Sequence, residues 1–203
     1  MDRRAHWQQE YGTKSPDEVS WTQKRPSTSL EFIESFRLDK DSKIIDVGGG
    51  DSNLVDFLLD LGYSNITVLD ISAKALEKAR NRLGERAGKV KWVVSDVVEY
   101  HPTETFDLWH DRAAFHFLTD PEQIDTYLKL VDQYVSKYLV LGTFSEAGPT
   151  KCSGLEIQQY SEKSMTELFG KKFDKIKCLT EDHMTPFGTK QNFLFCGFGK
   201  KDL

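Results

Sequence analysis

The sequence has few of the features that mark a secreted, membrane-bound or disulfide-stapled protein. Its three cysteines, Cys152, Cys178 and Cys196, are too few and too widely spaced for a disulfide framework. No run approaches the roughly 20 apolar residues that a bilayer-spanning helix needs, and the first residues lack the apolar core of a secretion signal. We therefore expect reduced thiols and a cytoplasmic protein without a membrane segment.

A basic block and a metal-ligand pattern are also missing. The 27 Lys and Arg residues are mixed with 32 Asp and Glu residues, for a formal net charge of -5, so no stretch offers a surface for nucleic-acid phosphates. There is no C-x-x-C pair, and the only short histidine spacing is His110 with His116, without a cysteine nearby. These absences argue against a nucleic-acid partner and against a metal site.

What the sequence does contain is a regular alternation of apolar runs and amphipathic segments from about residue 43 to the end. This alternation predicts an α/β fold with a doubly wound sheet, and 203 residues suffice for one core. We expect one domain over 43–203 after a helical extension over 1–42. The expected strands are 43–48, 66–70, 90–94, 106–110 and 138–142, then an antiparallel pair near 173–179 and 192–199. The expected helices are 29–36, 53–61, 72–80, 121–135 and 161–169.

The strongest functional signal is a glycine-rich turn, Asp46-Val47-Gly48-Gly49-Gly50, between the first strand and a helix. Glycines let the backbone turn sharply and approach a ligand closely at the carboxyl edge of the sheet. A nicotinamide dinucleotide site would need a third glycine where Asn53 stands, and Asp46 would repel its phosphates. Asp46 suits a ligand with an ammonium and a sulfonium, although an ordinary tight turn would also need glycines.

Two further carboxylates follow the next strands. Asp70 ends the second strand, where it can accept hydrogen bonds from both hydroxyls of a ribose. Asp96 ends the third strand, between Ser95 and Val97, where it can accept from an adenine amino group. Ile71 and Val97 would flank the nucleoside. Each aspartate by itself is also compatible with a turn or a helix cap.

These motifs resemble those of the class I, Rossmann-like S-adenosylmethionine-dependent methyltransferases, from about residue 40 to the C-terminus. The resemblance implies a mostly parallel seven-stranded sheet with one antiparallel strand near the C-terminus. It also implies S-adenosylmethionine as cofactor and S-adenosylhomocysteine as product. On this basis the cofactor residues are Asp46, Gly48, Gly49, Gly50, Asp70, Ile71, Ser95, Asp96 and Val97.

The segment from Phe106 to Leu118 matches the family's motif after the fourth strand, which faces the transferring methyl group. Methyl transfer requires a nucleophile held behind the methyl group and, for some acceptors, removal of a proton. His110, Asp111 and His116 are the candidates for that base, and each histidine could instead be structural. Asp111 and Arg112 could pair with each other and brace the loop.

The substrate side of the site is predicted at the N-terminus and in two loops. Trp7 and Tyr11 share one helical face, and with Trp21 and Arg112 they could form a lid; packing on the sheet is the alternative. The loop 142–155 lies at the same edge of the sheet, with Cys152 expected to be unreactive. The polar cluster 181–188 is expected to be a hairpin loop.

The function that these features predict is transfer of a methyl group to N, O or S, with a small molecule as the first candidate acceptor. A protein lysine side chain is the second candidate. The sequence Trp109-His110-Asp111-Arg112 stands where a nucleic-acid amino-methyltransferase would carry Asn/Asp-Pro-Pro-Tyr/Phe. A regulatory subunit that binds the cofactor without turnover and a nicotinamide-dependent oxidoreductase are the remaining alternatives. A monomer or a homodimer is expected.

Overall fold

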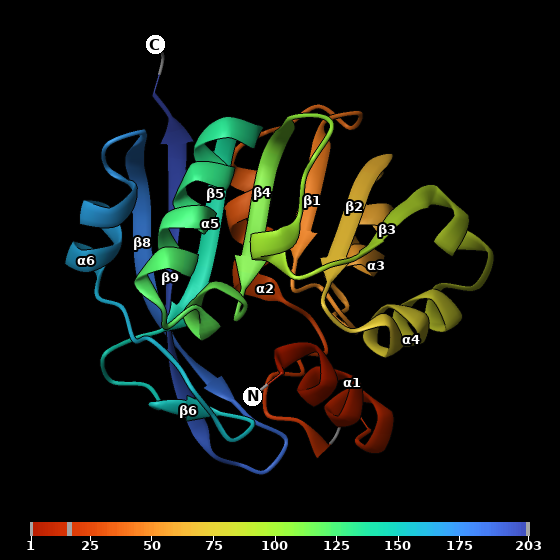
Figure 1. Cartoon of the computed structure of the whole chain (residues 1–203). Helices are drawn as coiled ribbons and strands as arrows, with labels where there is room; N and C mark the ends of the chain where they lie inside the picture. The colour runs from red at the N-terminus through yellow and green to blue at the C-terminus, as the bar shows by residue number, and fades with distance from the viewer. Residues whose placement is uncertain (1, 16–17, 202–203) are drawn as a thin grey trace.

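The computed structural model describes residues 2–15 and 18–201, and its centre is one seven-stranded sheet. The strand order is β3-β2-β1-β4-β5-β9-β8 (Figure 1). The strands are β1 (Lys43–Val47), β2 (Asn65–Asp70), β3 (Val90–Val94), β4 (Phe106–Arg112), β5 (Val135–Phe144), β8 (Phe173–Met184) and β9 (Lys190–Lys200). Only β9 runs antiparallel to its neighbours, β5 and β8. This confirms the predicted α/β class and the single antiparallel strand near the C-terminus.

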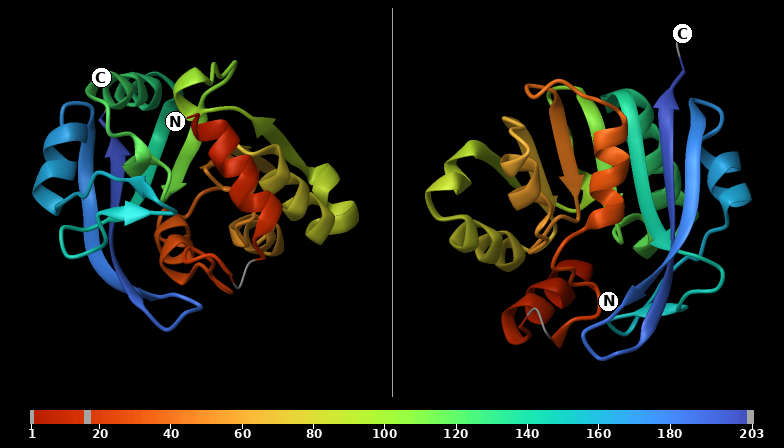
Figure 2. Two further views of the ribbon diagram at one scale, coloured as in Figure 1. Left: turned by 60° about the horizontal axis from the view of Figure 1, so that its bottom comes forward. Right: turned by 180° about the vertical axis from the view of Figure 1, so that it is seen from behind.

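Helices cover both faces of the sheet, as Figures 1 and 2 show. One face packs against α2 (Ser27–Ser35), α3 (Leu54–Asp60) and α4 (Ala73–Leu83), and the other against α5 (Pro121–Tyr134) and α6 (Glu162–Phe169). Short 3₁₀ turns lie at η2 (Gly84–Lys89), η3 (Val97–Glu99) and η4 (Phe115–Phe117). Ser72 caps α4 by accepting from the Ala75 N–H, as its position predicts.

The central strands are buried on both faces because a parallel sheet has helices on each side. Successive residues of a strand point to opposite faces. Ile44 of β1 and Leu108 of β4 pack with α2 and α3, whereas Ile45 and Trp109 pack with α5 and α6. The same alternation decides which polar residues at the ends of these strands reach the site.

The N-terminal helix α1 (Arg3–Thr13) lies across the carboxyl ends of the strands, apart from the layers that cover the sheet (Figures 1 and 2). In contrast, Leu30, Phe32 and Ile33 of α2 are part of the core. The predicted division into residues 1–42 and 43–203 therefore cuts between a helix that is built into the core and its own sheet. It stays a prediction, and α1 is the part of the extension that lies outside the core.

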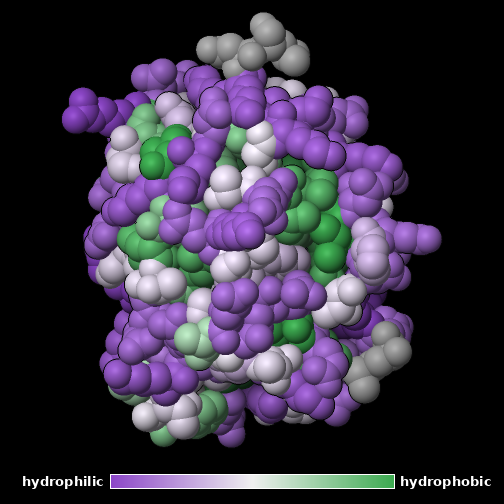
Figure 3. Space-filling model, turned by 90° about the vertical axis from the view of Figure 1, so that its left-hand side faces the viewer, coloured by the Kyte–Doolittle hydropathy of each residue, from purple (hydrophilic) through white to green (hydrophobic). Residues whose placement is uncertain are grey.

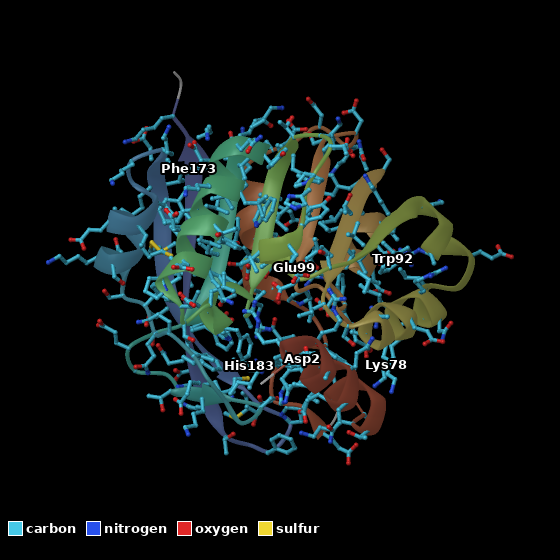
Figure 4. The ribbon with its side chains drawn as sticks, in the orientation of Figure 1. Asp2, Lys78, Trp92, Glu99, Phe173 and His183 are labelled. Atoms are coloured by element: carbon cyan, nitrogen blue, oxygen red, sulfur yellow. A yellow bond between two sulfur atoms is a disulfide. The ribbon has the colours of Figure 1, made fainter. Side chains whose placement is uncertain are left out.

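The last two strands are longer than the sequence predicts, and they extend past the sheet edge below the other strands (Figure 4). Glu181 to Met184, expected in a hairpin loop, lie in β8, and the connection is residues 185–189. Nε2 of His183, which is labelled in Figure 4, lies 2.7 Å from the Ser20 carbonyl oxygen. Because a carbonyl oxygen can only accept, His183 is the donor. This hydrogen bond links β8 to the segment after α1.

The expectation that all cysteines are reduced is wrong for two of them. Cys178 and Cys196 form a disulfide, while Cys152 is free and buried. The register of β8 and β9 places Cys178 directly opposite Cys196, with their Cα atoms 4.2 Å apart. Spacing along the sequence does not reveal this pair because the contact is created by cross-strand pairing. Free Cys152 lies in a separate two-stranded sheet, which is formed by β6 (Lys151–Cys152) and β7 (Leu155–Glu156).

The side that carries α6 and β8 is largely hydrophilic, with hydrophobic patches separated by polar residues (Figure 3). Among the described residues, no helix combines the length and the apolar character needed to span a membrane. Nor does any group of three or more His, Cys, Asp or Glu residues in the described ranges have the arrangement of a metal site.

Candidate active site

A pocket opens at the carboxyl edge of the sheet and brings together most of the residues predicted for the cofactor. Its lining includes Asp46, Gly48, Gly49, Asp70, Ile71, Ser95, Asp96 and Val97. All four residues predicted for substrate or lid line it as well: Trp7, Tyr11, Trp21 and Arg112. Of the predicted catalytic residues, His110 lines the pocket, whereas Asp111 and His116 do not.

The glycine turn after β1 leaves no room for side chains. Gly48 and Gly50 have φ angles of +67° and +42°, in the region that favours glycine. A Cβ on Gly48 would lie 2.6 Å from the Cβ of Ala114, and one on Gly50 would lie 2.8 Å from Asp70 Oδ2. Gly49 is also constrained, because its Cβ would lie 2.5 Å from Asp46 Oδ2.

Asp70 is a buried carboxylate at the end of β2. It accepts a hydrogen bond from the Ser72 N–H at 2.7 Å. Burial raises the pKa of Asp70 to about 7; the Ser72 N–H opposes this rise, and the nearby charge of Asp46 adds to it. The carboxyl group therefore titrates near neutral pH, which gives the pocket a pH dependence of its own.

We expect the affinity for S-adenosylhomocysteine to fall about tenfold between pH 8 and pH 6. An ionised Asp70 accepts from ribose hydroxyls, and a pKa of about 7 leaves roughly one molecule in ten ionised at pH 6. Calorimetric titration across this range measures the change. Asp70→Asn is the control, since it removes the titration. A wild-type affinity that stays flat with pH would contradict the assignment of Asp70 to the ribose.

Asp96 is engaged by the N-terminal helix. Its Oδ2 accepts from Arg3 Nη2 at 2.6 Å, and its Oδ1 accepts from the Val98 N–H at 3.2 Å. Gln8 adds a second tie, because its Oε1 accepts from the Ser72 hydroxyl at 3.1 Å. The role of Asp96 toward adenine stays a prediction. Arg3 was missed from the sequence because nothing in a single arginine of a polar helix indicates a partner 93 residues away.

Asp46, His110 and Ser29 form a buried chain of hydrogen bonds along one side of the pocket. Asp46 Oδ1 lies 2.7 Å from His110 Nδ1, and His110 Nε2 lies 2.9 Å from Ser29 Oγ. β1 and β4 are paired so that Asp46 is opposite His110. Because a carboxylate only accepts, Nδ1 donates to it, and Nε2 is engaged by the Ser29 hydroxyl. Both ring nitrogens are thus occupied, and we assign His110 to the positioning of Asp46.

Asp111 and His116 do not line the pocket, and both are buried and hydrogen-bonded to other parts of the chain. Asp111 accepts from the N–H groups of Ala114 and Phe115, each at 3.0 Å, and from the Tyr127 hydroxyl at 2.8 Å. It does not pair with Arg112, and the predicted brace between them is not formed. His116 accepts from the Phe144 N–H through Nδ1 at 3.2 Å. Burial lowers the pKa of His116 to about 3, so the ring is uncharged at neutral pH.

His116→Ala is expected to lower the free energy of unfolding by about 2 to 4 kcal/mol, through lost packing and an unpaired Phe144 N–H. The affinity for S-adenosylhomocysteine should stay within about twofold. Denaturant unfolding and calorimetry measure the two quantities. His101→Ala, at an exposed position, is the control and should change neither. A large loss of affinity with unchanged stability would return His116 to the site.

An aromatic cluster from the N-terminal segment and η4 forms one wall of the pocket. The ring centroid of Trp7 lies 5.5 Å from that of Trp21 and 5.1 Å from that of Phe117. Tyr11 lies 5.9 Å from Trp21. These rings come from α1, from the segment after it and from η4. The arrangement matches the predicted covering segment, and whether it moves as a lid stays a prediction. Phe117 and Ser29 were not singled out from the sequence.

Cys152 also lines the pocket. Burial raises the pKa of the Cys152 thiol to about 11, so the thiolate is scarce at neutral pH. This agrees with the expected passive thiol. The loop 142–155 reaches the site through this residue, although its first three residues belong to β5.

Residues 44–136, a little under half of the chain, match the model of the family described as "Methyltransferase domain". This part of the chain is therefore similar to a methyltransferase domain. The N-methyltransferase NodS from Bradyrhizobium japonicum, solved with S-adenosylhomocysteine, has the same fold: the TM-score is 0.77 at 16% identity, covering 99% of this chain and 100% of that one. The predicted fold is thereby confirmed, and the match to the methyltransferase domain agrees with the predicted family.

Two curated relatives are similar to parts of this chain. The malonyl-[acyl-carrier protein] O-methyltransferase 1 of Ilyobacter polytropus is 27% identical over 173 residues, covering 84% of this chain and 61% of the relative. The trans-aconitate 2-methyltransferase of Rhizobium etli is 30% identical over 109 residues, covering 53% of this chain and 40% of the relative. The chain thus spans less than two thirds of either relative.

Proposed function

We propose that the protein is an S-adenosylmethionine-dependent methyltransferase that acts on a small molecule. The observation that carries the proposal is the pocket itself. It joins the glycine turn, Asp70 and Asp96, which follow three adjacent strands, with the aromatic wall formed by Trp7 and Trp21. A site for the cofactor and a covered space beside it are the two parts that methyl transfer requires.

The residues present fit the cofactor. The turn at Gly48 and Gly50, which a Cβ would fill, admits close approach of a ligand, and Asp46 offers a carboxylate to an ammonium. We assign Asp70 to the ribose, and Asp96 to the adenine once Arg3 shares or releases it. The cofactor supplies a methyl group activated by the neighbouring sulfonium. The aromatic wall excludes water and can face that positive charge.

A small acceptor is favoured over a protein lysine by the position of α1. This helix is held over the carboxyl edge by Arg3 on Asp96 and by Gln8 on Ser72, so a long side chain would have to enter beneath or displace it. The names of the two relatives, malonyl-[acyl-carrier protein] O-methyltransferase and trans-aconitate 2-methyltransferase, support a small or carrier-bound acceptor. A monomer or homodimer in the cytoplasm stays a prediction.

The proposal is tested by calorimetric titration of the purified chain with S-adenosylmethionine, S-adenosylhomocysteine and NAD. We expect the first two to bind and NAD not to bind. Transfer of a radiolabelled methyl group is then measured with small carboxylic acids, amines and phenols, and separately with a denatured protein extract as a source of lysines. Binding of NAD alone would replace the proposal by an oxidoreductase. Cofactor binding without transfer to any acceptor would favour a regulatory subunit.

A further inference from the structure

Arg112 ends β4 inside the pocket, on the same side of the strand as His110. Its Nη1 donates to the Trp21 carbonyl oxygen at 3.0 Å. The guanidinium carbon lies 4.6 Å from the ring centroid of Phe193 of β9, a cation–π contact that holds the plane of the group. Arg112 is therefore fixed between the covering segment and β9, and it faces the space beside the glycine turn.

The guanidinium has donors that no group of the described chain satisfies. Nε and Nη2 are buried and lack a hydrogen-bond partner. Among the described residues, no carboxylate oxygen comes within 4 Å of the guanidinium nitrogens. Two carboxylates balance its charge from a greater distance: Glu181, whose Oε2 accepts from the Thr28 hydroxyl while its Oε1 has no partner, and Asp46, which is bonded to His110. Burial lowers the pKa of Arg112 to about 10, and Glu181 only partly offsets this effect, so the group is charged at neutral pH.

Nε and Nη2 are the pair of donors with which arginine binds both oxygens of one carboxylate. A charged arginine without a partner is costly in a partly dehydrated pocket. We propose that Arg112 binds a carboxylate of the methyl acceptor, so that the acceptor is a carboxylic acid. This inference rests on the proposed function and specifies its substrate class.

The hydrogen bonds of His110 favour an acceptor that is already anionic, because they leave no free ring nitrogen to act as a base. His110 is the one histidine among the described residues that line the pocket, and both of its nitrogens are occupied. A carboxylate is ionised at neutral pH and needs no base. Its oxygen forms the new O–CH₃ bond while the S–CH₃ bond breaks and leaves its electron pair on sulfur. The products are a methyl ester and S-adenosylhomocysteine, and no proton is moved.

The amino-acid part of the cofactor also carries a carboxylate, so the experiment has to separate the two sources. The saturated complex with S-adenosylhomocysteine is titrated calorimetrically with malonate, trans-aconitate and propionate, and with the amide of each. We expect the wild-type complex to bind at least one acid and not its amide. Arg112→Met should weaken that binding by about 30-fold or more. Arg112→Lys should fall between, because it keeps the charge without the paired donors.

Arg86→Met is the matched control, because Arg86 pairs with Asp60 on the surface and does not line the pocket. It should bind like wild type. Circular dichroism shows whether Arg112→Met is folded; if it is not, Arg112→Lys and the contrast of acid with amide in the wild type decide the question. Failure of all three acids to bind the wild-type complex would overturn the inference and leave the proposed function intact.

The cofactor arm compares S-adenosylhomocysteine with 5′-methylthioadenosine, which lacks the amino-acid part. Arg112→Met should bind both as tightly as wild type does. If this variant loses affinity for S-adenosylhomocysteine but not for 5′-methylthioadenosine, Arg112 holds the carboxylate of the cofactor. This result would overturn the inference but support the proposed function. If wild type does not bind S-adenosylhomocysteine, the proposed function fails and the inference fails with it.

Discussion

Asp70→Ala is expected to weaken the binding of S-adenosylhomocysteine by about 30- to 150-fold. Asp70 is the buried carboxylate at the end of β2 that lines the pocket, and we assign it to the two ribose hydroxyls. Hydrogen bonds to a charged group contribute about 1.5 to 3 kcal/mol, and a loss of about 2 to 3 kcal/mol corresponds to this range of affinity. Calorimetric titration at pH 8, where Asp70 is ionised, measures the effect.

The ligand-free variant should not be less stable than wild type, which separates a lost contact from a damaged fold. Ionisation of Asp70 is opposed by burial. The folded state binds this proton more tightly than the unfolded state, so Asp70 costs stability as the pH rises from about 4 to about 7. Asp60→Ala removes an exposed carboxylate outside the pocket and should retain full affinity. Equal affinities for both variants would remove Asp70 from the cofactor site.

The sheet and the cofactor side of the pocket could be predicted because both depend on local patterns. Buried parallel strands are short apolar runs, and their carboxyl ends meet at one edge. Asp46 lies in the last two residues of β1, Asp70 ends β2, and Asp96 follows β3 by two residues, so their convergence requires only the strand order. The order β3-β2-β1 places these three strands side by side.

The acceptor side was harder to predict because it depends on the direction of each side chain at the end of β4. Alternation along the strand puts His110 and Arg112 on one face and Asp111 on the other, toward Tyr127 of α5. His116 lies beyond the strand in η4, where the turn brings it beneath Phe144. No periodicity predicts the direction of a residue in such a turn. The sequence therefore could not rank His110, Asp111 and His116 as candidate bases.

Contacts across the chain could not be predicted from the sequence at all. Arg3 reaches Asp96, Ser29 reaches His110, and Cys178 bonds to Cys196. The last pair depends on a register that shifts at a bulge between Lys175 and Lys177. A shift of one residue in β8 would turn Cys178 to the other face. Pairing of these cysteines is thus a property of the folded hairpin.

Gly48→Ala is expected to abolish detectable cofactor binding and to lower the free energy of unfolding by about 2 to 5 kcal/mol. A side chain at positive φ costs about 1 to 2 kcal/mol, and overpacking adds about 1 to 3 kcal/mol. The new Cβ would lie 2.6 Å from the Cβ of Ala114, which has no flexible end that could move away. Either the turn or η4 must shift, and both border the pocket.

Gly62→Ala separates the two contributions. Gly62 has a φ of +88° at the end of α3, but a Cβ there would meet no heavy atom within 4 Å. This variant should lose about 1 to 2 kcal/mol of stability and keep the affinity of wild type, as measured by denaturant unfolding and calorimetry. If Gly48→Ala behaved like Gly62→Ala in both measurements, the close approach of the turn to Ala114 would not matter for the cofactor. Because Ala114 follows Arg112 by two residues, a shift there would also displace the proposed carboxylate site, so the two halves of the pocket are coupled through this contact.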